Sequence, residues 1–559
     1  MSSTVRRAVV ALLLLGLAFR VLFVAQDMRA LVMRGPLYDD SFYSFEIARH
    51  IAHGDGSTFD GSTPTNGYQP LYVFLLVPVY WLAGANATAP IYIALLGSAL
   101  CNVLTGWILF RLLRKYASLR AAFFGLVLWS FGPAIVRQAV NGLETSLAML
   151  LVAVSIEYYL GVYRQAAVPA RRQSLTLGAL LGLAVFARVD ALLFAAALGA
   201  DALIRGGAGA RRPLLFVGLA ASIVMTPWCV GSRILFGSML PESGRATRFL
   251  SEAYAPHDHP EFSAATFSHG PPPMFLAENF SRSLLQLGTS PVLHVFTRGL
   301  ERSLQAAQVT PVASLYAVGG FLLLGFLVFG WFWSRRRRGG LGVPRDFVFL
   351  LAYSGALVCA YSFVIFGQIF YSRYYYPVFF VSILLGAVAF DVLMNLIRAP
   401  RLRRTVTFAC TAAYALTLAY MSLHRVQNGN YRFLHVVDWI AARTEPGARI
   451  GVFNSGAIGY FSDRQIVNLD GKVNPEAFVA LKQGTICEYI ESQGIEYVID
   501  HEWIVQHFLA GGAAATPPRI HLARLDGADA LGVPGWAAYR VVQDVAAGAT
   551  EASAVAIRP

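Results

Sequence analysis

Two adjacent aspartates, Asp39 and Asp40, are the first residues that could do chemistry, since they follow soon after the first apolar segment. They belong to the stretch LYDDSFYSFEIARHIAHGDG, residues 37–56. A carboxylate within hydrogen-bond reach of a hydroxyl group can accept its proton and activate the oxygen as a nucleophile. One aspartate here could simply cap a helix, because carboxylates favour the positive end of the helix dipole. Two adjacent carboxylates exceed what a cap requires, so both are candidate catalytic residues.

The residues that follow the pair are predicted to form an amphipathic helix. At about 100° per residue, Asp39 shares one face with Tyr43, Glu46, His50 and His53, and apolar residues occupy the other face. A helix of this kind lies flat on a membrane with its apolar face down. We therefore expect the side chains of Glu46, His50 and His53 to be solvated.

The composition of the whole chain is that of a membrane protein. Its 559 residues are 56% hydrophobic and only 14% charged. Repeated runs of about 20 apolar residues match the thickness of the bilayer core. The net charge of +13 fits basic cytoplasmic loops. No nucleic-acid-binding motif appears, so we expect no nucleic-acid partner.

The apolar runs predict eleven membrane spans, and one further apolar stretch decides the topology. The stretch at 70–84 is short and contains two prolines. If it lies along the interface or re-enters, five clusters of basic residues share the side of the N-terminus, as the positive-inside rule requires. The loops 27–90 and 232–310 and the tail are then outside. The predicted spans lie near 8–26, 91–110, 121–138, 144–162, 174–189, 190–204, 213–231, 311–333, 346–366, 375–397 and 405–423.

Several charged residues fall at span ends on this outer side. A charge at the centre of a bilayer costs about 2.5–3.5 kcal/mol, so such residues mark functional sites by default. An arginine at a span end can also be explained by snorkelling to the interface. The residues concerned are Glu144, Arg188, Asp190, Arg233 and Arg373.

The tail changes in character. Residues 448–478 alternate short strand-like runs with Gly and Asn turns, and residues 485–501 read as helix, Gly break and strand. This order predicts a small α/β domain at 425–559, after a transmembrane domain at 1–424. The expected fold class is an α-helical polytopic membrane protein with about eleven transmembrane helices, interfacial helices and a small C-terminal α/β domain outside the cytoplasm.

One segment of the first outer loop is DDSFYSFEIARHIAHGDGSTFDGSTPTNGYQPLYVF. It resembles the first outer loop of the polytopic GT-C glycosyltransferases, which include lipid-A aminoarabinose transferases, protein O-mannosyltransferases and mycobacterial arabinofuranosyltransferases. Five further segments resemble bacterial members of the class and occur in the same order. They are NGLETSLAMLL (141–151), FARVDALLF (186–194), PWCVGSRILFGSMLPESG (227–244), SRYYYPVFF (372–380) and GAIGYFSDRQIVNLDGKVN (456–474).

The resemblance implies an inverting glycosyltransferase of the cell membrane. It would move a sugar from a polyprenyl-phosphate donor to a cell-envelope glycan, lipid or protein. Transfer would take place on the outer, periplasmic side, with the N-terminus in the cytoplasm. Asp39 and Asp40 would supply the catalytic base, with their division of labour open.

The resemblance also suggests residues for the two substrates. A phosphate leaving group needs cations or strong donors to take up its charge. Gln69 stands where aminoarabinose transferases carry a lysine, so it offers a hydrogen bond but no charge. Tyr374 could contact a sugar or belong to an aromatic belt. The phosphate candidates are Arg373, Arg233, Arg188 and Gln69, and the acceptor or sugar candidates are Glu144, Asp190, Asn66, Tyr68 and Tyr374.

The sequence says less about cofactors and about rival functions than about the substrate residues. No cofactor is required, although some members of the class use a divalent cation near the acidic pair, which leaves a metal at Asp39 and Asp40 open. Without a GxxxxGK[ST] loop, nucleotide-sugar use has no support. A flippase or transporter of lipid-linked sugars would place its charges near mid-membrane in two related halves. An oligosaccharide ligase would share the outer-face chemistry but require more phosphate-binding cations.

Overall fold

The computed structural model describes residues 2–258, 271–287, 290–292, 345–365, 373–426, 432–510 and 520–543. Contacts between Cα atoms divide the chain into two compact units. The first, here called the helical unit, comprises residues 1–25, 95–227 and 251–427. The second, the mixed unit, comprises residues 26–94, 228–250 and 428–559. This division groups the first predicted outer loop with the tail, whereas the predicted domain boundary lies at 424/425.

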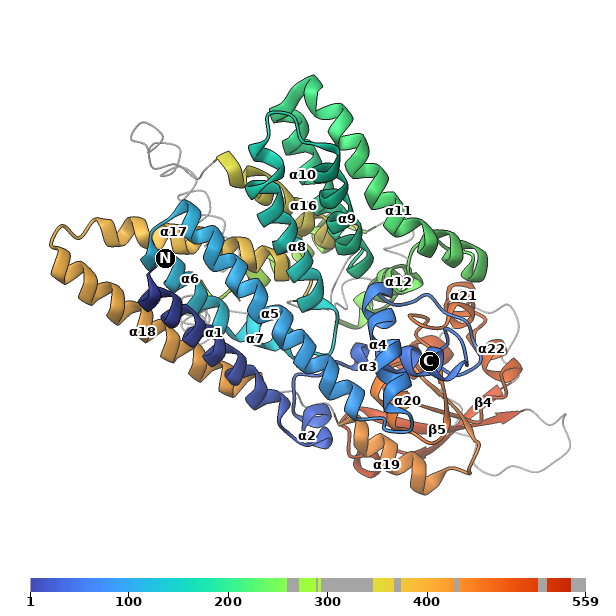
Figure 1. The fold of residues 1–559 in the computed structure, drawn as a ribbon. Coiled ribbons are helices and arrows are strands. Elements are labelled where there is room, and N and C mark those ends of the chain that lie inside the picture. The colour runs from blue at the N-terminus through green and yellow to red at the C-terminus, as the bar shows by residue number, and fades with distance from the viewer. Residues whose placement is uncertain are drawn as a thin grey trace, which may run out of the picture. The chain divides into compact units, whose positions relative to one another are not determined.

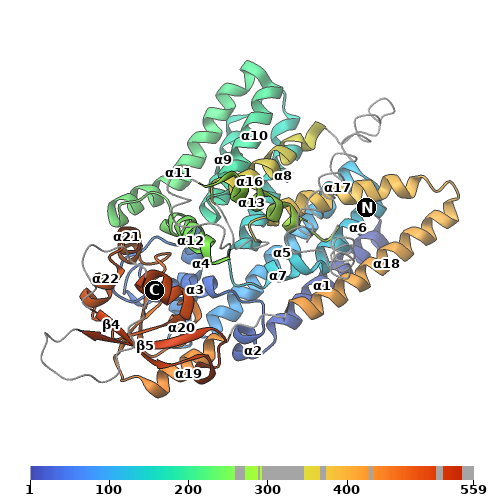
Figure 2. The ribbon, with the colours of Figure 1, turned by 180° about the vertical axis from the view of Figure 1, so that it is seen from behind.

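The helical unit consists of long apolar helices. In Figure 1, α6 lies among α1, α17 and α18, and Figure 2 shows α8, α9, α10 and α16 as neighbours. Its helices, some of which continue into the mixed unit, are α1 (Ser3–Val24), α5 (Ala89–Tyr116), α6 (Leu119–Phe131), α7 (Pro133–Ala139), α8 (Thr145–Gly161), α9 (Arg171–Ala187), α10 (Ala191–Gly206), α11 (Arg211–Phe236), α13 (Pro273–Leu287), α16 (Val348–Phe363), α17 (Tyr376–Asn395) and α18 (Pro400–Arg425).

These helices confirm a multi-pass membrane protein. Every predicted span coincides with a helix or a helix pair, except the span at 311–333, which lies outside the described residues. In the part of the chain that the structure describes, six helical segments are long and apolar enough to cross a membrane. A seventh is added if α6 and α7, which meet at an angle of 58°, form one broken span. The number of spans therefore stays a prediction.

The stretch at 70–84 folds as α4 (Pro70–Ala83), a helix of 14 residues in the mixed unit. At 1.5 Å per residue its length is about 21 Å, short of the roughly 30 Å of a bilayer core. Its length is thus compatible with the interfacial or re-entrant position on which the predicted topology depends.

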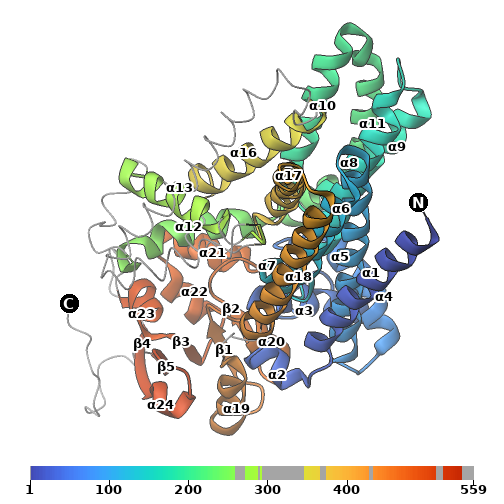
Figure 3. The same ribbon diagram turned by 90° about the vertical axis from the view of Figure 1, so that its left-hand side faces the viewer.

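The tail forms a five-stranded sheet in the order β2-β1-β3-β5-β4, which confirms the predicted α/β domain. Strands β1 (Arg449–Val452), β2 (Gln465–Asn468) and β3 (Tyr497–His501) are parallel to one another. Strand β5 (Trp536–Gln543) pairs antiparallel with both β3 and β4 (Ile520–Asp526). Figure 3 shows the strands together with their flanking helices. The helices are α19 (Phe433–Arg443), α20 (Gly456–Phe461), α21 (Pro475–Gln483), α22 (Ile486–Ser492), α23 (Glu502–Val505) and α24 (Ala528–Leu531).

The sheet brings two loops of the tail together. The carboxyl ends of neighbouring parallel strands meet at one edge, where ligands bind in many open α/β sheets. Strands β1 and β2 are neighbours with Val452 opposite Asn468. The loops that follow them, 453–455 and 469–474, therefore start from the same edge.

The first loop contributes three helices to the mixed unit: α2 (Met28–Met33), α3 (Asp39–His53) and α4. Residues 41–48 of α3 are all buried, and α3 contacts both α4 and α20. Phe42, for example, packs against the rings of Tyr460 and Phe461 in α20. A helical wheel shows which residues share a face of a helix but not what covers that face. In α3, protein covers most of both the polar and the apolar face.

The prediction that Glu46 is solvated is therefore wrong. Its side chain is buried, and one oxygen pairs with the guanidinium of Arg49 at 2.5 Å. Burial raises the pKa of Glu46 to about 7, against the opposing effect of Arg49. Of the two histidines, His53 is exposed as expected, and His50 is partly buried, with its Nδ1 2.9 Å from the Thr58 carbonyl oxygen.

Candidate active site

Asp39 is the first residue of α3, yet its carboxylate caps a different helix. Its Oδ1 accepts a hydrogen bond from the N–H of Ala457 at 2.7 Å, and its Oδ2 accepts one from Gly456 at 3.1 Å. Both N–H groups belong to the first turn of α20, where a helix has no backbone acceptor for them. A Cβ atom at Gly456 would collide with the backbone of Asp39. Glycine at this position thus permits the close approach that the cap needs.

Burial raises the pKa of the Asp39 carboxyl to about 7. The hydrogen bond from Ala457 opposes this shift, and the charge of Asp40 adds to it. Such a high pKa is unusual for an aspartate.

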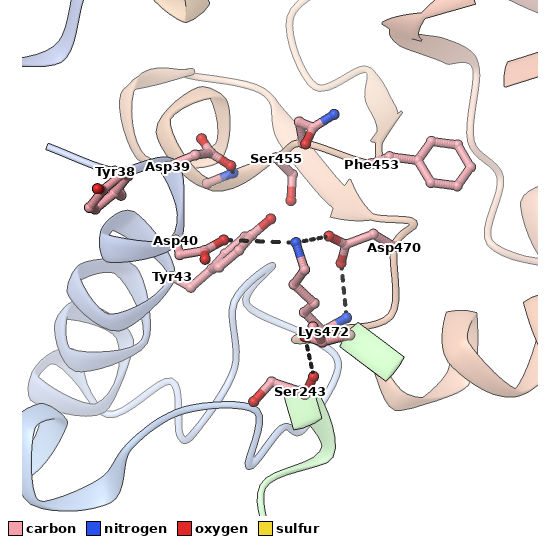
Figure 4. Close-up of polar contacts among 12 residues, drawn as sticks. Tyr38, Asp39, Asp40, Tyr43, Ser243, Phe453, Ser455, Asp470 and Lys472 are labelled. Carbon is pink, nitrogen blue, oxygen red and sulfur yellow. Dashed lines mark hydrogen bonds and ion pairs between the residues drawn. The ribbon is translucent and has the colours of Figure 1, made fainter. Parts of the chain in front are cut away.

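Asp40 faces a lysine that comes from the tail. The Nζ of Lys472 lies 3.8 Å from Oδ1 of Asp40 and 3.0 Å from Oδ2 of Asp470 (Figure 4). The Asp470 side chain is almost fully buried, whereas those of Asp40 and Lys472 are 24% and 21% exposed. The ammonium group therefore stands between two carboxylates at a position that solvent reaches.

The turn that carries Lys472 is held firmly. The N–H of Lys472 donates to Oδ1 of Asp470 at 2.9 Å, and the N–H of Gly471 donates to Oδ1 of Asn468 at 3.0 Å. Gly471 has a φ of 77°, which favours glycine. On the other side, a Cβ atom at Gly67 would collide with the Lys472 carbonyl oxygen. The polar loop 54–70 therefore packs directly against this turn.

Figure 4 also draws Tyr43 and Ser455 near the acidic pair. Burial raises the pKa of the Tyr43 hydroxyl well above its ordinary value, and the charges of Asp470 and Asp39 act in the same direction. Tyr43 is thus a neutral hydroxyl group at neutral pH. The Oγ of Ser455 accepts a hydrogen bond from Nδ2 of Asn468 at 2.9 Å, which ties the loop after β1 to the end of β2.

The structure gives Asn66 and Tyr68 protein partners rather than an open binding surface. Nδ2 of Asn66 donates to Oγ of Ser232 at 2.8 Å, and its Oδ1 accepts from the N–H of Glu242 at 3.1 Å. The hydroxyl of Tyr68 lies 2.8 Å from Oγ of Ser57. Both side chains are buried and hold the loop 54–70 in place, so we do not carry them into the proposed substrate site.

Gln69 and Arg233 also lie in the mixed unit. Oε1 of Gln69 is buried without a hydrogen-bond partner among the described residues. Gln69 precedes the first turn of α4, and it stays a candidate donor or acceptor for a ligand. Arg233 is exposed and donates to the carbonyl of Gly237, just beyond the end of α11, at 2.6 Å.

The predicted residues of the helical unit form a second cluster. Arg188 donates to Glu144 through Nη1 at 2.6 Å and to Asp190 through Nη2 at 2.6 Å. Nε of Arg188 adds a second bond to Asp190 at 3.1 Å, and the Tyr361 hydroxyl donates to Asp190 at 2.6 Å. One buried guanidinium thus compensates two carboxylates at the junction of α9 and α10.

Arg373 and Tyr374 adjoin this cluster. The ring of Tyr374 stacks on that of Tyr361 at 4.5 Å between centroids. Nη2 of Arg373 donates to the Tyr374 hydroxyl at 3.0 Å, and its guanidinium lies 5.0 Å from the centre of the ring. Five predicted residues from three segments therefore come together. They are Glu144, Arg188, Asp190, Arg373 and Tyr374.

Sequence reasoning missed Lys472 and Asp470. Both lie in NLDGKVN, part of a segment that resembles the GT-C class, but neither was singled out because the tail was assigned to a separate domain. The signal that could have identified them is a lysine two residues after an aspartate, around a glycine, directly after a predicted strand.

The raised pKa of Asp39 predicts that the stability of the protein depends on pH. The folded protein, with a pKa of about 7 at Asp39, holds a proton that the unfolded chain has lost from roughly pH 4 upward. Stability should therefore fall as pH rises from 5 to 8, by about 3 kcal/mol from this group. Thermal unfolding of the purified protein at several pH values measures the decline, which should be shallower for Asp39→Asn.

The matched control is Asp463→Asn, since the Asp463 side chain is 71% exposed. Glu46 and Asp500, with pKa values raised by burial to about 7 and about 6, act in the same direction. They are present in every variant, so the difference between native protein and Asp39→Asn isolates Asp39. An identical pH slope in those two proteins would contradict the assignment.

Comparisons with known proteins show which families and folds the chain is similar to. The model described as the Alg9-like mannosyltransferase family matches residues 17–240, which include the acidic pair. A model described as a domain of unknown function (DUF8728) matches residues 421–555. No curated protein matches the chain.

Solved structures match over most of the chain. The oligosaccharyltransferase of Archaeoglobus fulgidus tethered with an acceptor peptide has a TM-score of 0.54 at 13% identity, covering 89% of this chain and 69% of that one. Oligosaccharyltransferase AglB from the same organism, in complex with an inhibitory peptide and a dolichol-phosphate, has a TM-score of 0.50 at 13% identity, with 94% and 73% covered. ArnT from Cupriavidus metallidurans bound to undecaprenyl phosphate has a TM-score of 0.48 at 15% identity, with 97% and 98% covered.

The AglB structures show the fold, and the match of residues 17–240 to a mannosyltransferase family indicates glycosyl transfer. Together they support a multi-pass membrane glycosyltransferase with a fold similar to that of AglB. Within that class, residues 17–240 are similar to the Alg9-like mannosyltransferase family. The predicted class is thereby confirmed.

Proposed function

We propose that the protein is an inverting glycosyltransferase that moves a sugar from a polyprenyl-phosphate donor to a hydroxyl group of a glycan, lipid or protein. The observation that carries the proposal is the Asp40 carboxylate, which lies beside the ammonium group of Lys472. Asp40 belongs to the segment that is similar to the Alg9-like mannosyltransferase family. The donor class is supported by AglB, a protein of similar fold described with a dolichol-phosphate.

The proposed reaction is a single displacement at the anomeric carbon. The base accepts the proton of the acceptor hydroxyl as its oxygen attacks from the face opposite the phosphate. The bond between the anomeric carbon and the phosphate oxygen breaks, and the polyprenyl phosphate leaves with the electron pair. The new glycosidic bond therefore has the inverted configuration.

We assign the base to Asp40 and a positioning role to Asp39. Both oxygens of Asp39 already accept N–H groups of α20, which fixes that carboxylate as a cap. Asp40 is partly exposed, and an ammonium group at 3.8 Å favours its ionised, basic form. The first loop and the tail then act together, since Asp39 caps α20, which precedes β2, and the loop after β2 carries Asp470 and Lys472.

For the donor phosphate we propose Arg373 ahead of Arg188 and Arg233. The charge of Arg188 is matched by two buried carboxylates, and Arg233 already donates to a carbonyl at a helix end. Arg373 is largely buried and contacts an aromatic ring. A guanidinium in such surroundings suits two parallel hydrogen bonds to a phosphate group.

We further propose that transfer takes place on the outer face of the cell membrane. The support is the sequence topology, in which the basic clusters lie on the side of the N-terminus and the acidic pair lies opposite. Transfer to a membrane-impermeant acceptor should therefore be detected with sealed right-side-out vesicles. Transfer with sealed inverted vesicles alone would contradict this orientation.

The experiment that tests the function is a donor panel. Membranes containing the protein are incubated with radiolabelled polyprenyl-phosphate hexoses and pentoses, the matching nucleotide sugars, and a polyprenyl-pyrophosphate oligosaccharide. We expect transfer from at least one polyprenyl-phosphate sugar, with inversion visible by NMR of the product. Transfer from a nucleotide sugar alone, or of a whole oligosaccharide from the pyrophosphate lipid, would refute the proposal.

A further inference from the structure

The ammonium group of Lys472 stands at a point where two carboxylates converge. Asp40 comes from α3 and Asp470 from the loop after β2, and both point toward Nζ (Figure 4). Two carboxylates that face each other repel unless a cation lies between them. In many enzymes a divalent metal ion serves this purpose, with carboxylate oxygens as its ligands.

The residues around the acidic pair do not fit such a metal ion. A divalent cation needs several oxygen ligands at about 2.0–2.6 Å. Asp39 is already committed to two N–H groups of α20, and Nζ of Lys472 occupies the space between the other two carboxylates. Among the described residues, no group of three or more His, Cys, Asp or Glu side chains could hold a metal.

The lysine is also not easily displaced. Its backbone N–H is bonded to the same Asp470 that binds its ammonium group. The Lys472 carbonyl is packed against Gly67, and the turn depends on the positive φ of Gly471. The side chain therefore starts from a fixed point and reaches back to the acidic pair.

We propose that the ammonium group of Lys472 takes the place of a divalent cation at the acidic pair, so that this protein catalyses transfer without a metal ion. The inference rests on the proposed function and names the cation of the same site. One positive charge, on Lys472, does not fully balance the two carboxylates of Asp40 and Asp470, so these three side chains together stay net negative. Asp40 therefore stays more basic than a carboxylate bound to a divalent ion would be.

The first test measures metal binding without any donor. Purified native protein should contain less than about 0.1 divalent ion per chain by mass spectrometry, and millimolar Mg²⁺ or Mn²⁺ should not shift its melting temperature. Lys472→Met leaves two carboxylates without their ammonium group, so Mg²⁺ or Mn²⁺ should raise its melting temperature. A native protein that purifies with one divalent ion per chain would overturn the inference.

The second test measures transfer with the donor identified by the panel. Native activity should change less than about twofold between EDTA and millimolar Mg²⁺. Lys472→Met should lose about 10²-fold or more in EDTA and recover at least tenfold with Mg²⁺ or Mn²⁺. Lys472→Arg, which keeps the charge, should remain independent of metal, and Lys482→Met, on the exposed side of α21, should match the native protein.

The two tests separate failure of the inference from failure of the function. Native activity that EDTA abolishes and Mg²⁺ restores would overturn the role of Lys472 while leaving the donor assignment intact. Transfer from nucleotide sugars alone would refute the function, whereas metal content and melting temperature would still decide whether Lys472 replaces a cation.

Discussion

Asp40→Asn is expected to reduce sugar transfer by about 10²–10⁴-fold, the range in which a general base contributes. Asparagine has nearly the same shape as aspartate but cannot take up the proton of the acceptor hydroxyl. Because the Asp40 side chain is partly exposed and its ion pair with Lys472 is long, at 3.8 Å, the fold should tolerate the change. The rate of transfer at saturating donor, with melting temperature as a check on folding, measures the effect.

The matched control is Asp55→Asn, an exposed carboxylate in the same loop, which should retain native activity. Asp39→Asn is the informative companion, since it disturbs the cap of α20 as well as the charge. If Asp39→Asn abolishes transfer at native stability while Asp40→Asn stays active, the two assignments must be exchanged.

Arg188→Ala is expected to destabilise the protein by about 3–5 kcal/mol, because it leaves Glu144 and Asp190 without their buried cation. The change also removes bonds that join the end of α9 to the start of α10. Thermal unfolding in detergent and the yield of monodisperse protein measure the loss. The exposed Arg233 provides the control, since Arg233→Ala should change stability by less than about 0.5 kcal/mol.

A double variant sharpens this prediction. In Arg188→Met with Glu144→Gln, one of the stranded charges is also removed, so the two effects should be strongly non-additive. If Arg188→Ala is as stable as the native protein and instead loses donor binding, Arg188 is a phosphate ligand after all.

The helices were predictable because a chain inside a bilayer must satisfy its own backbone hydrogen bonds. Each long apolar run of the described chain is accordingly a helix, and only the break between α6 and α7 interrupts one. The charges Glu144, Arg188 and Asp190 were also predictable as exceptional, since they stand out in apolar surroundings. Whether such charges bind a ligand or neutralise one another depends on packing, and no sequence period encodes that.

The pairing across the acidic site could not be predicted for the same reason. Asp39 finds its partners 417 and 418 residues later, and Asp40 meets a lysine at a similar separation. Local patterns identify α3 and the strands around Lys472 separately. Only the tertiary fold shows that the polar face of α3, with Glu46, is covered by protein rather than by water.

The cap that Asp39 forms on α20 has a consequence for biosynthesis. The acidic pair is translated more than 400 residues before Gly456, Ala457 and Lys472. Until the tail has folded, the first loop has neither its cap partner nor its cation. Every nascent or prematurely terminated chain that ends before Gly456 should therefore be inactive, so that the membrane holds no partly made enzyme capable of consuming the donor.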